Sequence, residues 1–281
     1  MTNILQQPLS DRYHLLELIL VADGSSDGTD EIITNLSKNV PLIKTWVFKS
    51  RLGKVQCVNK LLKHAAALHI DVAVFPMADT LPEIGTLNLL LQQFENEDVG
   101  GTCGRTIPVN GGQSIVGRVV RSIWKVHNLI LQDHPKINGE MYAVRPQLIG
   151  QVPSYVPWED AYIEIPILRK GQKITFVEDA VVYMNGPSTF RELIKQRIRI
   201  NTGYLIVTRR EGHKAPTTRV LILVRSCIGL AVGSGASLIP CLIIAAAIEG
   251  YARLIAFANY NRQGIPYVWE RLTTTKGPLA T

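Results

Sequence analysis

Short apolar runs alternate with helical segments through the first hundred residues, and this alternation constrains the fold more than any other feature. The apolar runs are Leu15–Ala22, Leu42–Phe48 and Val72–Pro76, and helices are expected over residues 29–38, 54–68 and 82–96. Strands that alternate with helices form a parallel sheet with both faces covered. The sequence therefore predicts an α/β, Rossmann-like fold with a mostly parallel sheet and flanking helices.

The pattern is less regular after Gly100, although several further elements can be assigned. Helices are expected over 115–131, over 159–169 and from Ser188 to Tyr204, and strands over 141–144 and 173–184. In open α/β sheets, ligands bind beyond the carboxyl ends of the strands. Asp23 and Asp79 both follow a predicted strand. We therefore expect these two aspartates to face one crevice.

The formal charge of +7 suits nucleic acid, anionic lipid or a phosphorylated substrate, and its distribution helps to choose among them. Nine cationic residues precede the most apolar part of the chain: Arg191, Lys195, Arg197, Arg199, Arg209, Arg210, Lys214, Arg219 and Arg225. Such a stretch is typical of the cytoplasmic flank of a membrane segment. We therefore expect a membrane partner and no nucleic acid.

The four cysteines are scattered and form no Cys-x-x-Cys pair, which supports neither a zinc site nor a disulfide framework. Residues 1–13 are largely polar and do not show the basic-then-apolar pattern of a signal peptide. Membrane targeting is therefore expected to come from the C-terminal third.

Ser226–Ile248 contains no charged residue. As a helix it would be about 34 Å long, against a hydrocarbon core of about 30 Å. Because glycines and Pro240 interrupt it, a hairpin that turns near residues 233–237 is an alternative to a single pass, and a buried helix pair is a third possibility.

The sequence predicts three parts of the chain. The expected domains are residues 1–205, a basic juxtamembrane linker with a membrane helix or hairpin over 206–260, and a tail over 261–281.

Three polar motifs near the predicted strand ends are candidates for binding a phosphorylated ligand. The first, Val21–Thr29, places Asp23 and Gly24 at a strand-to-helix turn, where acceptors can bind a base or ribose. In the second, Gly53 and Lys54 open a helix, whose amino end favours an anion. In the third, Asp79 follows a strand and can bind a hard divalent cation.

Two further motifs carry candidate catalytic groups. Glu159 and Asp160 follow Pro157-Trp158, and paired carboxylates in a partly apolar pocket raise one pKa, as a general base requires. Adjacent helical residues do not face each other, so one of the two is expected to reach the substrate, and we assign Asp160. Gln196 and Arg199 share one helix face, where the arginine can neutralise a leaving diphosphate.

Each motif also has an ordinary structural explanation. The first fits a capped turn, Lys54 an exposed lysine, and Asp79 a turn residue. The carboxylate pair fits an acidic first turn of a helix, and the arginines near Gln196 fit a basic face toward a membrane.

Taken together, in this order and at these separations, the motifs resemble family 2 glycosyltransferases of the GT-A fold over residues 15–203. The resemblance implies that Asp23 contacts the nucleotide, that Gly53, Lys54 and Asn59 belong to the Gly-Lys-x-x-Ala-Leu-Asn-like segment, and that Asp79 ends the Asp-x-Asp metal motif for Mn or Mg. It also implies acceptor-side roles for Gly139 and Arg145, a catalytic base at Asp160, and a Gln-x-x-Arg-Trp-like motif at Gln196 and Arg199.

Four departures from the family pattern affect these expectations. The family's usual first strand and its Pro-x-x-Asn-Glu-like loop are not found in this sequence. Met77 replaces the first metal-binding aspartate, and a thioether is a poor ligand for magnesium or manganese. Ala22 stands where the family often has an aspartate, and Ile200 replaces a tryptophan that helps to hold an acceptor sugar.

The resemblance implies an inverting enzyme, and the apolar C-terminal segment with its basic flank places it at the cell membrane with a cytoplasmic catalytic domain. It would move a sugar from a nucleotide-diphosphate donor to an acceptor hydroxyl, on a lipid-linked or polysaccharide acceptor. The alternative is a catalytically silent, membrane-anchored relative that binds a nucleotide or a protein partner. A nucleotidyltransferase is disfavoured, because its Gly-rich basic signature near the first strand is not found in this sequence.

Overall fold

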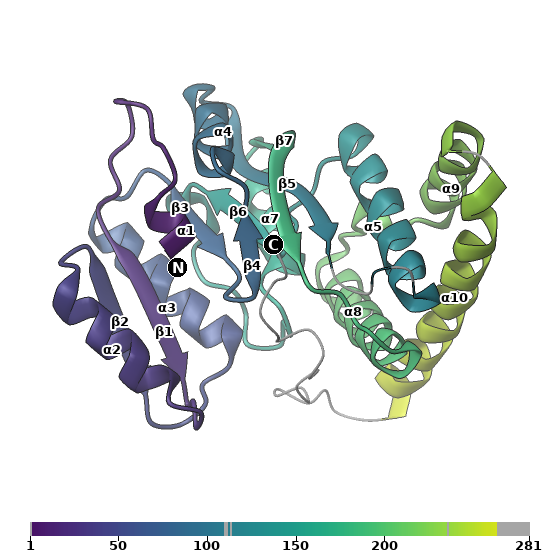
Figure 1. Ribbon diagram of the computed structural model, residues 1–281, viewed down its shortest axis with the longest axis horizontal. Helices are drawn as coiled ribbons and strands as arrows, with labels where there is room; N and C mark the ends of the chain where they lie inside the picture. Colours follow the sequence, from purple (N-terminus) through teal and green to yellow (C-terminus); the bar gives the residue numbers. More distant parts are fainter. Residues whose placement is uncertain (1, 110–111, 113, 235, 263–281) are drawn as a thin grey trace.

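The computed structural model describes residues 2–109, 112, 114–234 and 236–262. A two-stranded parallel sheet lies at one end of the molecule and a five-stranded sheet lies at its centre (Figure 1). The strands are β1 (Leu18–Asp23), β2 (Ile43–Phe48), β3 (Ala73–Pro76), β4 (Thr80–Pro82), β5 (Val99–Pro108), β6 (Met141–Val144) and β7 (Lys173–Met184).

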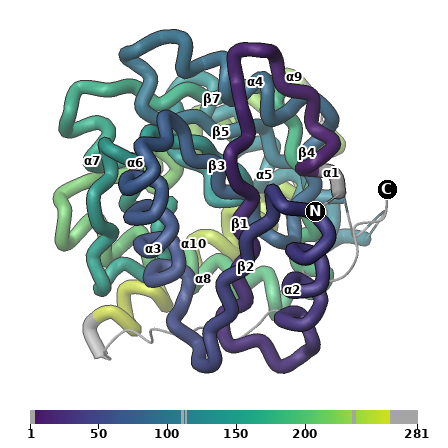
Figure 2. The backbone as a smooth tube through the Cα atoms, turned by 90° about the vertical axis from the view of Figure 1, so that its left-hand side faces the viewer, coloured from purple at the N-terminus to yellow at the C-terminus, as the bar shows by residue number. Residues whose placement is uncertain are grey.

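The longer helices are α2 (Thr29–Asn39), α3 (Lys54–Ala67), α5 (Ile115–Asp133), α7 (Asp160–Arg169), α8 (Phe190–Glu211), α9 (Val220–Ser234) and α10 (Ile239–Arg262). The shorter ones are α1 (Thr2–Leu5), α4 (Thr86–Gln92), α6 (Pro146–Ile149) and the 3₁₀ turns η1 (Gln93–Glu95), η2 (Pro216–Thr218) and η3 (Ala236–Leu238). Figure 2 shows α2 and α3 on either side of the β1–β2 sheet.

The five-stranded sheet has the order β3-β6-β5-β7-β4. Only β5 and β7 pair in parallel there, whereas β6 runs antiparallel to β3 and β5, and β4 runs antiparallel to β7. The expected parallel pairing therefore holds for β1–β2 and β5–β7, while the alternation of strands and helices is as predicted. Although β4 follows β3 after a turn of three residues, the two strands lie at opposite edges of this sheet, and β4 pairs with β7.

The sequence did not predict β5, although it is the central strand. Its glycines explain both the weak strand signal and the close packing around it. A Cβ at Gly104 would lie 2.1 Å from the carbonyl oxygen of Ala180 on β7, and one at Gly100 would lie 2.7 Å from side-chain atoms of Ile167 and Leu148. Glycine therefore allows β7 and α7 to approach this strand.

The C-terminal helices pack on the central domain. Val207 of α8 and Leu242 of α10 belong to the main hydrophobic core, and partly buried residues of α9, including Leu223 and Leu230, pack against it. Because α8 is continuous through residues 205 and 206, the expected boundary lies inside a helix. In the expected tail, residues 263–281 lie outside the described part of the chain.

The uncharged run Ser226–Ile248 does not form a single helix. It is divided between α9, which ends at Ser234, and α10, which begins at Ile239. Among the described residues, the stretch Ile239–Tyr260 is the one that is long and apolar enough to cross a membrane, by length and composition alone. The run is therefore two helices joined by η3, each packed on the central domain, and how they lie relative to a membrane stays a prediction.

Candidate active site

Asp23 organises the loop that leads into α3. One of its carboxylate oxygens accepts a hydrogen bond from the backbone N–H of Leu52 at 2.6 Å, and the other accepts one from Gly53 at 2.9 Å. The amide of Gly53, which was expected to face a phosphate, is therefore directed at Asp23. The carboxylate that was expected to read the nucleotide holds the start of α3 in place.

Gly24 and Gly53 make this loop possible through their backbone conformation. Both have positive φ angles, of 63° and 90°. A Cβ at Gly24 would also lie 2.7 Å from the backbone nitrogen of Arg51. Since residues with side chains rarely adopt positive φ, the two glycines are explained by the turn itself.

Lys54 and Glu159 form the ion pair at the centre of the site. Their Nζ and Oε1 atoms lie 2.6 Å apart, with Lys54 39% and Glu159 1% exposed at the side chain. The Tyr142 hydroxyl donates to the same Oε1 at 3.3 Å. Burial lowers the pKa of Lys54, but Glu159 and Asp160 outweigh it and raise the pKa overall. Lys54 therefore stays protonated and is directed at the carboxylate pair.

Asp160 is the more accessible carboxylate of the pair. It is the first residue of α7 and is partly exposed, whereas Glu159 is fully buried. Burial also raises the pKa of Glu159, against the opposing charge of Lys54. Gly139 lies directly against Asp160, since a Cβ on Gly139 would be 2.8 Å from its Oδ2 atom. The structure thus separates the two carboxylates into a buried partner for Lys54 and a group that can meet a substrate.

Arg199 of α8 faces the same region from the other side. Its guanidinium lies over the ring of Trp158, 5.0 Å from the ring centroid. Burial lowers the pKa of Arg199, and the negative charges of Glu140, Asp160 and Asp79 oppose that shift. Asp79, in the turn after β3, therefore acts electrostatically on the same arginine as Asp160.

Trp158 is seated against α8 at a glycine. A Cβ on Gly203 would lie 2.0 Å from the indole Nε1 atom. The ring therefore fits between Arg199 and the backbone of the following helical turn. Gln196 lies three residues before Arg199 on α8 and is partly buried, so the two residues share a helix face.

Asn59 and Arg145, both expected to bind substrate, make hydrogen bonds with backbone groups of the chain, and their substrate-binding roles stay predictions. Asn59 exchanges two hydrogen bonds of 2.8 Å with the backbone of Val152, which fastens α3 to the segment before α7. Arg145 donates to the carbonyl oxygens of Val99 and Phe94, both at 2.9 Å. Arg145 follows the end of β6, whereas Gly139 precedes its start, and only Gly139 lies against Asp160.

The donor set offers a divalent cation one carboxylate at the predicted position. Met77 lies before Asp79, and a thioether suits magnesium or manganese poorly. Among the described residues, no group of three or more His, Cys, Asp or Glu side chains could enclose a metal ion. A cation held by Asp79 would therefore need its remaining ligands from a bound diphosphate and from water.

Three residues of the site were not predicted from the sequence: Glu140, Tyr142 and Trp158. Glu140 acts electrostatically on both Lys54 and Arg199. Glu140 could have been found from its position in the sequence, next to Gly139 and directly before a short predicted strand. Tyr142 resembles an ordinary strand residue, and nothing in its local sequence indicates a contact with Glu159.

Known proteins share this sequence pattern and this fold. The family model described as "Glycosyl transferase family 2" matches residues 1–147, which include Asp23, Lys54, Asp79 and Gly139 and end before the Glu159-Asp160 pair. The solved structure of the mannosyltransferase PcManGT from Pyrobaculum calidifontis, in complex with GDP-Man and Mn2+, is similar with a TM-score of 0.61. The identity is 19%, and the match covers 93% of this chain and 82% of that one, which shows the GT-A-like fold.

Curated proteins similar to this chain in sequence are also named as glycosyltransferases or polysaccharide synthases, at low identity. "Probable glycosyltransferase YdaM" of Bacillus subtilis is 24% identical over 66% of this chain and 46% of its own length. "Poly-beta-1,6-N-acetyl-D-glucosamine synthase" of Staphylococcus aureus is 22% identical over 76% of this chain and 54% of its own length. The chain thus spans about half the length of these relatives. Because the family model covers more than half of its residues, the chain belongs to glycosyl transferase family 2.

Proposed function

We propose that this chain transfers a sugar from a nucleotide-diphosphate sugar to an acceptor hydroxyl, with inversion at the anomeric carbon. Asp160 takes the hydroxyl proton as the acceptor oxygen bonds to the anomeric carbon. The bond from that carbon to the diphosphate oxygen breaks, and the nucleoside diphosphate leaves with the electron pair. Arg199 offsets part of the negative charge that develops on the leaving group.

The observation that carries this proposal is the division of roles between Glu159 and Asp160. Glu159 is committed to Lys54 and Tyr142, whereas Asp160 is partly exposed beside Gly139. A general base must reach the proton that it removes, and a buried, paired carboxylate does not. Asp160 fits that requirement better than its neighbour.

Asp79 would hold a divalent cation together with the diphosphate of the donor. When bound, such a cation supplies positive charge that stabilises a departing diphosphate. The support is the position of Asp79 near Arg199 and the Mn2+ in the similar mannosyltransferase structure. We assign the donor to the nucleotide sugars and the acceptor to a lipid-linked or polysaccharide hydroxyl at the cytoplasmic face of a membrane.

The proposal is tested with the purified 281-residue chain, Mn2+, and GDP-mannose or UDP-N-acetylglucosamine as donor, by release of nucleoside diphosphate. Asp160→Asn is expected to lower turnover by about 10²–10⁴-fold, because the base is lost. Calorimetric binding of GDP or UDP should remain. Asp179→Asn, the same change at an exposed carboxylate of β7, serves as the control and should leave turnover unchanged.

The silent alternative makes the opposite prediction in the same assay. It is motivated by Met77 and by the single carboxylate at the predicted metal position. Failure to bind either diphosphate would favour a partner-binding role. Full activity of Asp160→Asn would show instead that the base is assigned to the wrong residue.

A further inference from the structure

The outward faces of α9 and α10 are apolar along almost their whole length. On α9 the exposed hydrophobic residues recur with helical spacing at Val220, Leu221, Val224, Ile228 and Val232. On α10 they are Ile239, Ile243, Tyr251, Leu254 and Phe257. Leu221 and Val232 of α9 are 85% and 81% exposed, and Leu254 of α10 is 72% exposed, which is unusual for large apolar side chains. Continuous apolar faces of this kind mark a surface that is covered in the working protein.

The opposite faces of both helices are already covered by the domain. Cys241, Ala245 and Ile248 of α10 pack with Val119 and Val120 of α5. Figure 1 shows α9 and α10 at the end of the molecule opposite β1 and β2, outside α5 and α8. The exposed apolar residues of the two helices thus lie at one end of the molecule, and together they are here called the α9–α10 surface.

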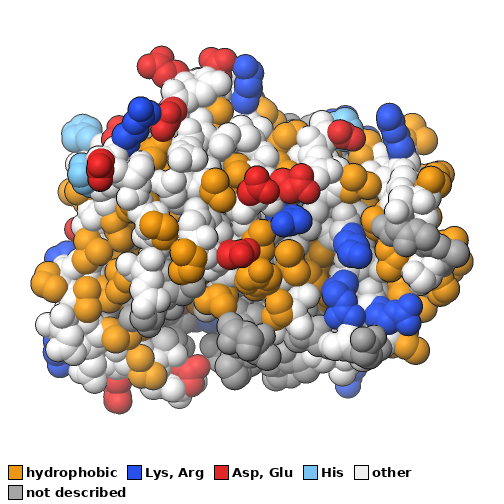
Figure 3. Space-filling view, turned by 45° about the horizontal axis from the view of Figure 1, so that its top comes forward, with side chains coloured by type: hydrophobic (Ala, Val, Ile, Leu, Met, Phe, Trp, Pro, Cys, Tyr) orange, Lys and Arg blue, Asp and Glu red, His pale blue; other side chains and the backbone are white. Residues whose placement is uncertain are grey.

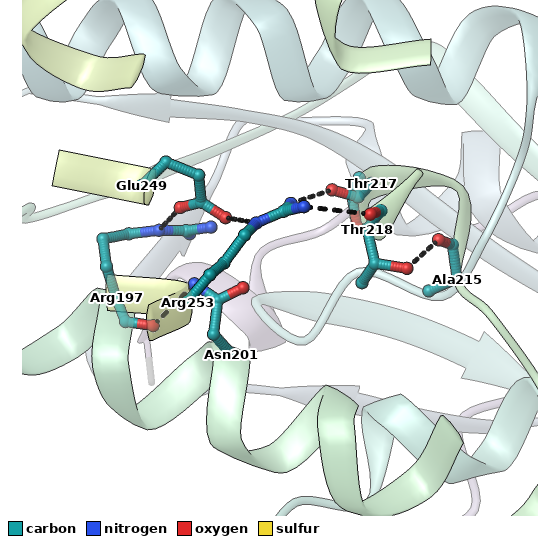
Figure 4. A network of polar contacts seen from close by, with 7 residues as sticks. All are labelled: Arg197, Asn201, Ala215, Thr217, Thr218, Glu249 and Arg253. Carbon is teal, nitrogen blue, oxygen red and sulfur yellow. Dashed lines mark hydrogen bonds and ion pairs between the residues drawn. The ribbon is translucent and has the colours of Figure 1, made fainter. Parts of the chain in front are cut away.

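A network of ion pairs holds α10 to α8 (Figure 4). Glu249 binds the Nε atoms of Arg197 on α8 at 2.8 Å and of Arg253 at 3.0 Å. Arg253 also donates to the carbonyl oxygens of Thr218 and Thr217 in η2, at 3.1 and 3.4 Å. The network thus joins α8, α10 and the turn that precedes α9.

This attachment argues against a helix that crosses a bilayer. A spanning α10 would carry Glu249 and Arg253 into the hydrocarbon core, together with the α8 helix that is paired with it along its length. The other helix, α9, has 15 residues and would be about 22 Å long, which is shorter than a core of about 30 Å. Neither helix fits a transmembrane position while it stays packed on the domain.

The exposed charges around the α9–α10 surface are basic. Arg225 lies on the exposed face of α9, and Arg219 and Lys214 are exposed directly before that helix. Among the described residues 212–260, Glu249 is the one acidic residue, and it is bound to Arg197 and Arg253. Figure 3 shows Lys and Arg side chains gathered with hydrophobic ones toward the end where α9 and α10 lie. Apolar side chains beside cations are complementary to an interface with anionic headgroups.

We infer that the α9–α10 surface lies flat on an anionic bilayer, with its apolar side chains in the headgroup region and neither helix crossing the membrane. The inference deepens the membrane location proposed above and does not depend on sugar transfer. It assigns one continuous face of the chain to lipid and leaves the sheet and the carboxylate site in water.

The test is flotation of the full chain with vesicles of phosphatidylcholine alone or with phosphatidylglycerol, without any nucleotide sugar. Binding is expected to be strong only with phosphatidylglycerol, to weaken in high salt, and to be released by alkaline carbonate. Leu221→Glu should reduce binding about tenfold or more, since it removes an exposed leucine that would enter the headgroup region and adds a negative charge. Arg225→Gln should reduce it about fivefold, on the anionic vesicles alone.

Ile32→Glu is the matched control, because Ile32 is 61% exposed on α2 at the other end of the molecule. It should bind vesicles like the unchanged chain. Binding that resists carbonate and protects α10 from protease would overturn the inference in favour of a spanning helix. A dimer that forms in solution, with no vesicle binding, would overturn it in favour of a second copy, while the transferase proposal would stand on its own assay.

Discussion

Two buried or half-buried glutamates, one in the candidate site and one in the C-terminal helices, are paired with cations in different ways. Glu249 has both carboxylate oxygens bound, one to Arg197 and one to Arg253. Glu159 binds Lys54 through Oε1, and its buried Oε2 has no hydrogen-bond partner among the described residues. A buried polar atom without a partner is costly. The fully bonded Glu249 fits a structural role, whereas the Oε2 of Glu159, free in the described part of the chain, fits a site where a ligand or water completes the hydrogen bonding.

The same helix serves both regions. Arg197 and Arg199 lie two positions apart on α8, so their side chains point to different sides of it. Arg197 reaches Glu249, whereas Arg199 lies over Trp158 near the acidic residues. The comparison therefore predicts that changes at Glu159 affect the site directly, and that changes at Glu249 act mainly on stability.

The largest expected effect is that of Lys54→Met, which leaves Glu159 as a buried charge without its cation. Breaking a buried ion pair costs about 3–5 kcal/mol, and we expect about 3 kcal/mol because Lys54 is partly exposed. Burial would then raise the pKa of Glu159 without opposition, so stability should be greatest below its unfolded-state pKa and fall as the pH rises. Urea unfolding at several pH values measures both effects, and a pH-independent loss would contradict them.

The next effect is that of Gly139→Ala on turnover. The new methyl group would lie 2.8 Å from Oδ2 of Asp160, so the carboxylate must move. Displacing a catalytic group by about 1 Å costs about 10²-fold in rate. Turnover with either donor should fall by that amount while binding of the diphosphate is kept. Unchanged turnover would show that Asp160 is not held by this contact.

A smaller effect is expected for Glu249→Gln, which removes the charge from both ion pairs but keeps the volume. Hydrogen bonds to charged groups contribute about 1.5–3 kcal/mol, and we expect about 2 kcal/mol from urea unfolding. The double variant with Arg197→Gln should lose less than the sum of the two single losses. Additive losses would mean that the two residues do not act as a pair.

The smallest effect is expected for Gly250→Ala, which makes the same substitution as Gly139→Ala at a position away from the candidate site. Gly250 is an exposed residue within α10, and a Cβ there would meet nothing within 4 Å. Alanine is favoured over glycine inside helices by about 0.5–1 kcal/mol, so Gly250→Ala should raise the thermal unfolding midpoint slightly and leave turnover unchanged. A loss of stability would indicate that the backbone at Gly250 is strained.

Local sequence patterns predicted the elements that alternate, and most of their boundaries. The helix predicted over 54–68 is α3, Lys54–Ala67, and the strand predicted over 141–144 is β6. The central strand β5 was missed because Gly100, Gly101 and Gly104 weaken a strand pattern. The glycines fit only once α7 and β7 are packed against them. The antiparallel pairings were also missed, because the direction in which two strands pair depends on the assembled sheet and not on the local sequence of either strand.

The site was predicted in part. The sequence offered Asp79, Asp160 and Arg199 as members of three separate motifs, and both aspartates act electrostatically on Arg199 in the structure. It could not separate Glu159 from Asp160 by burial, because their difference depends on where α7 begins and on what covers it. Nor could it foresee that Arg145 would be directed at backbone carbonyls of Phe94 and Val99, since those partners lie 46 or more positions away in sequence.

The continuity of α8 also affects how this protein can be prepared for study. A version that ends at residue 205 would cut the helix inside its turns and remove Ile206 and Val207, which are at most 1% exposed. It would also remove Glu249, the ion-pair partner of Arg197. A water-soluble form is therefore better sought by replacing outward-facing leucines and isoleucines with polar residues than by deleting the C-terminal helices.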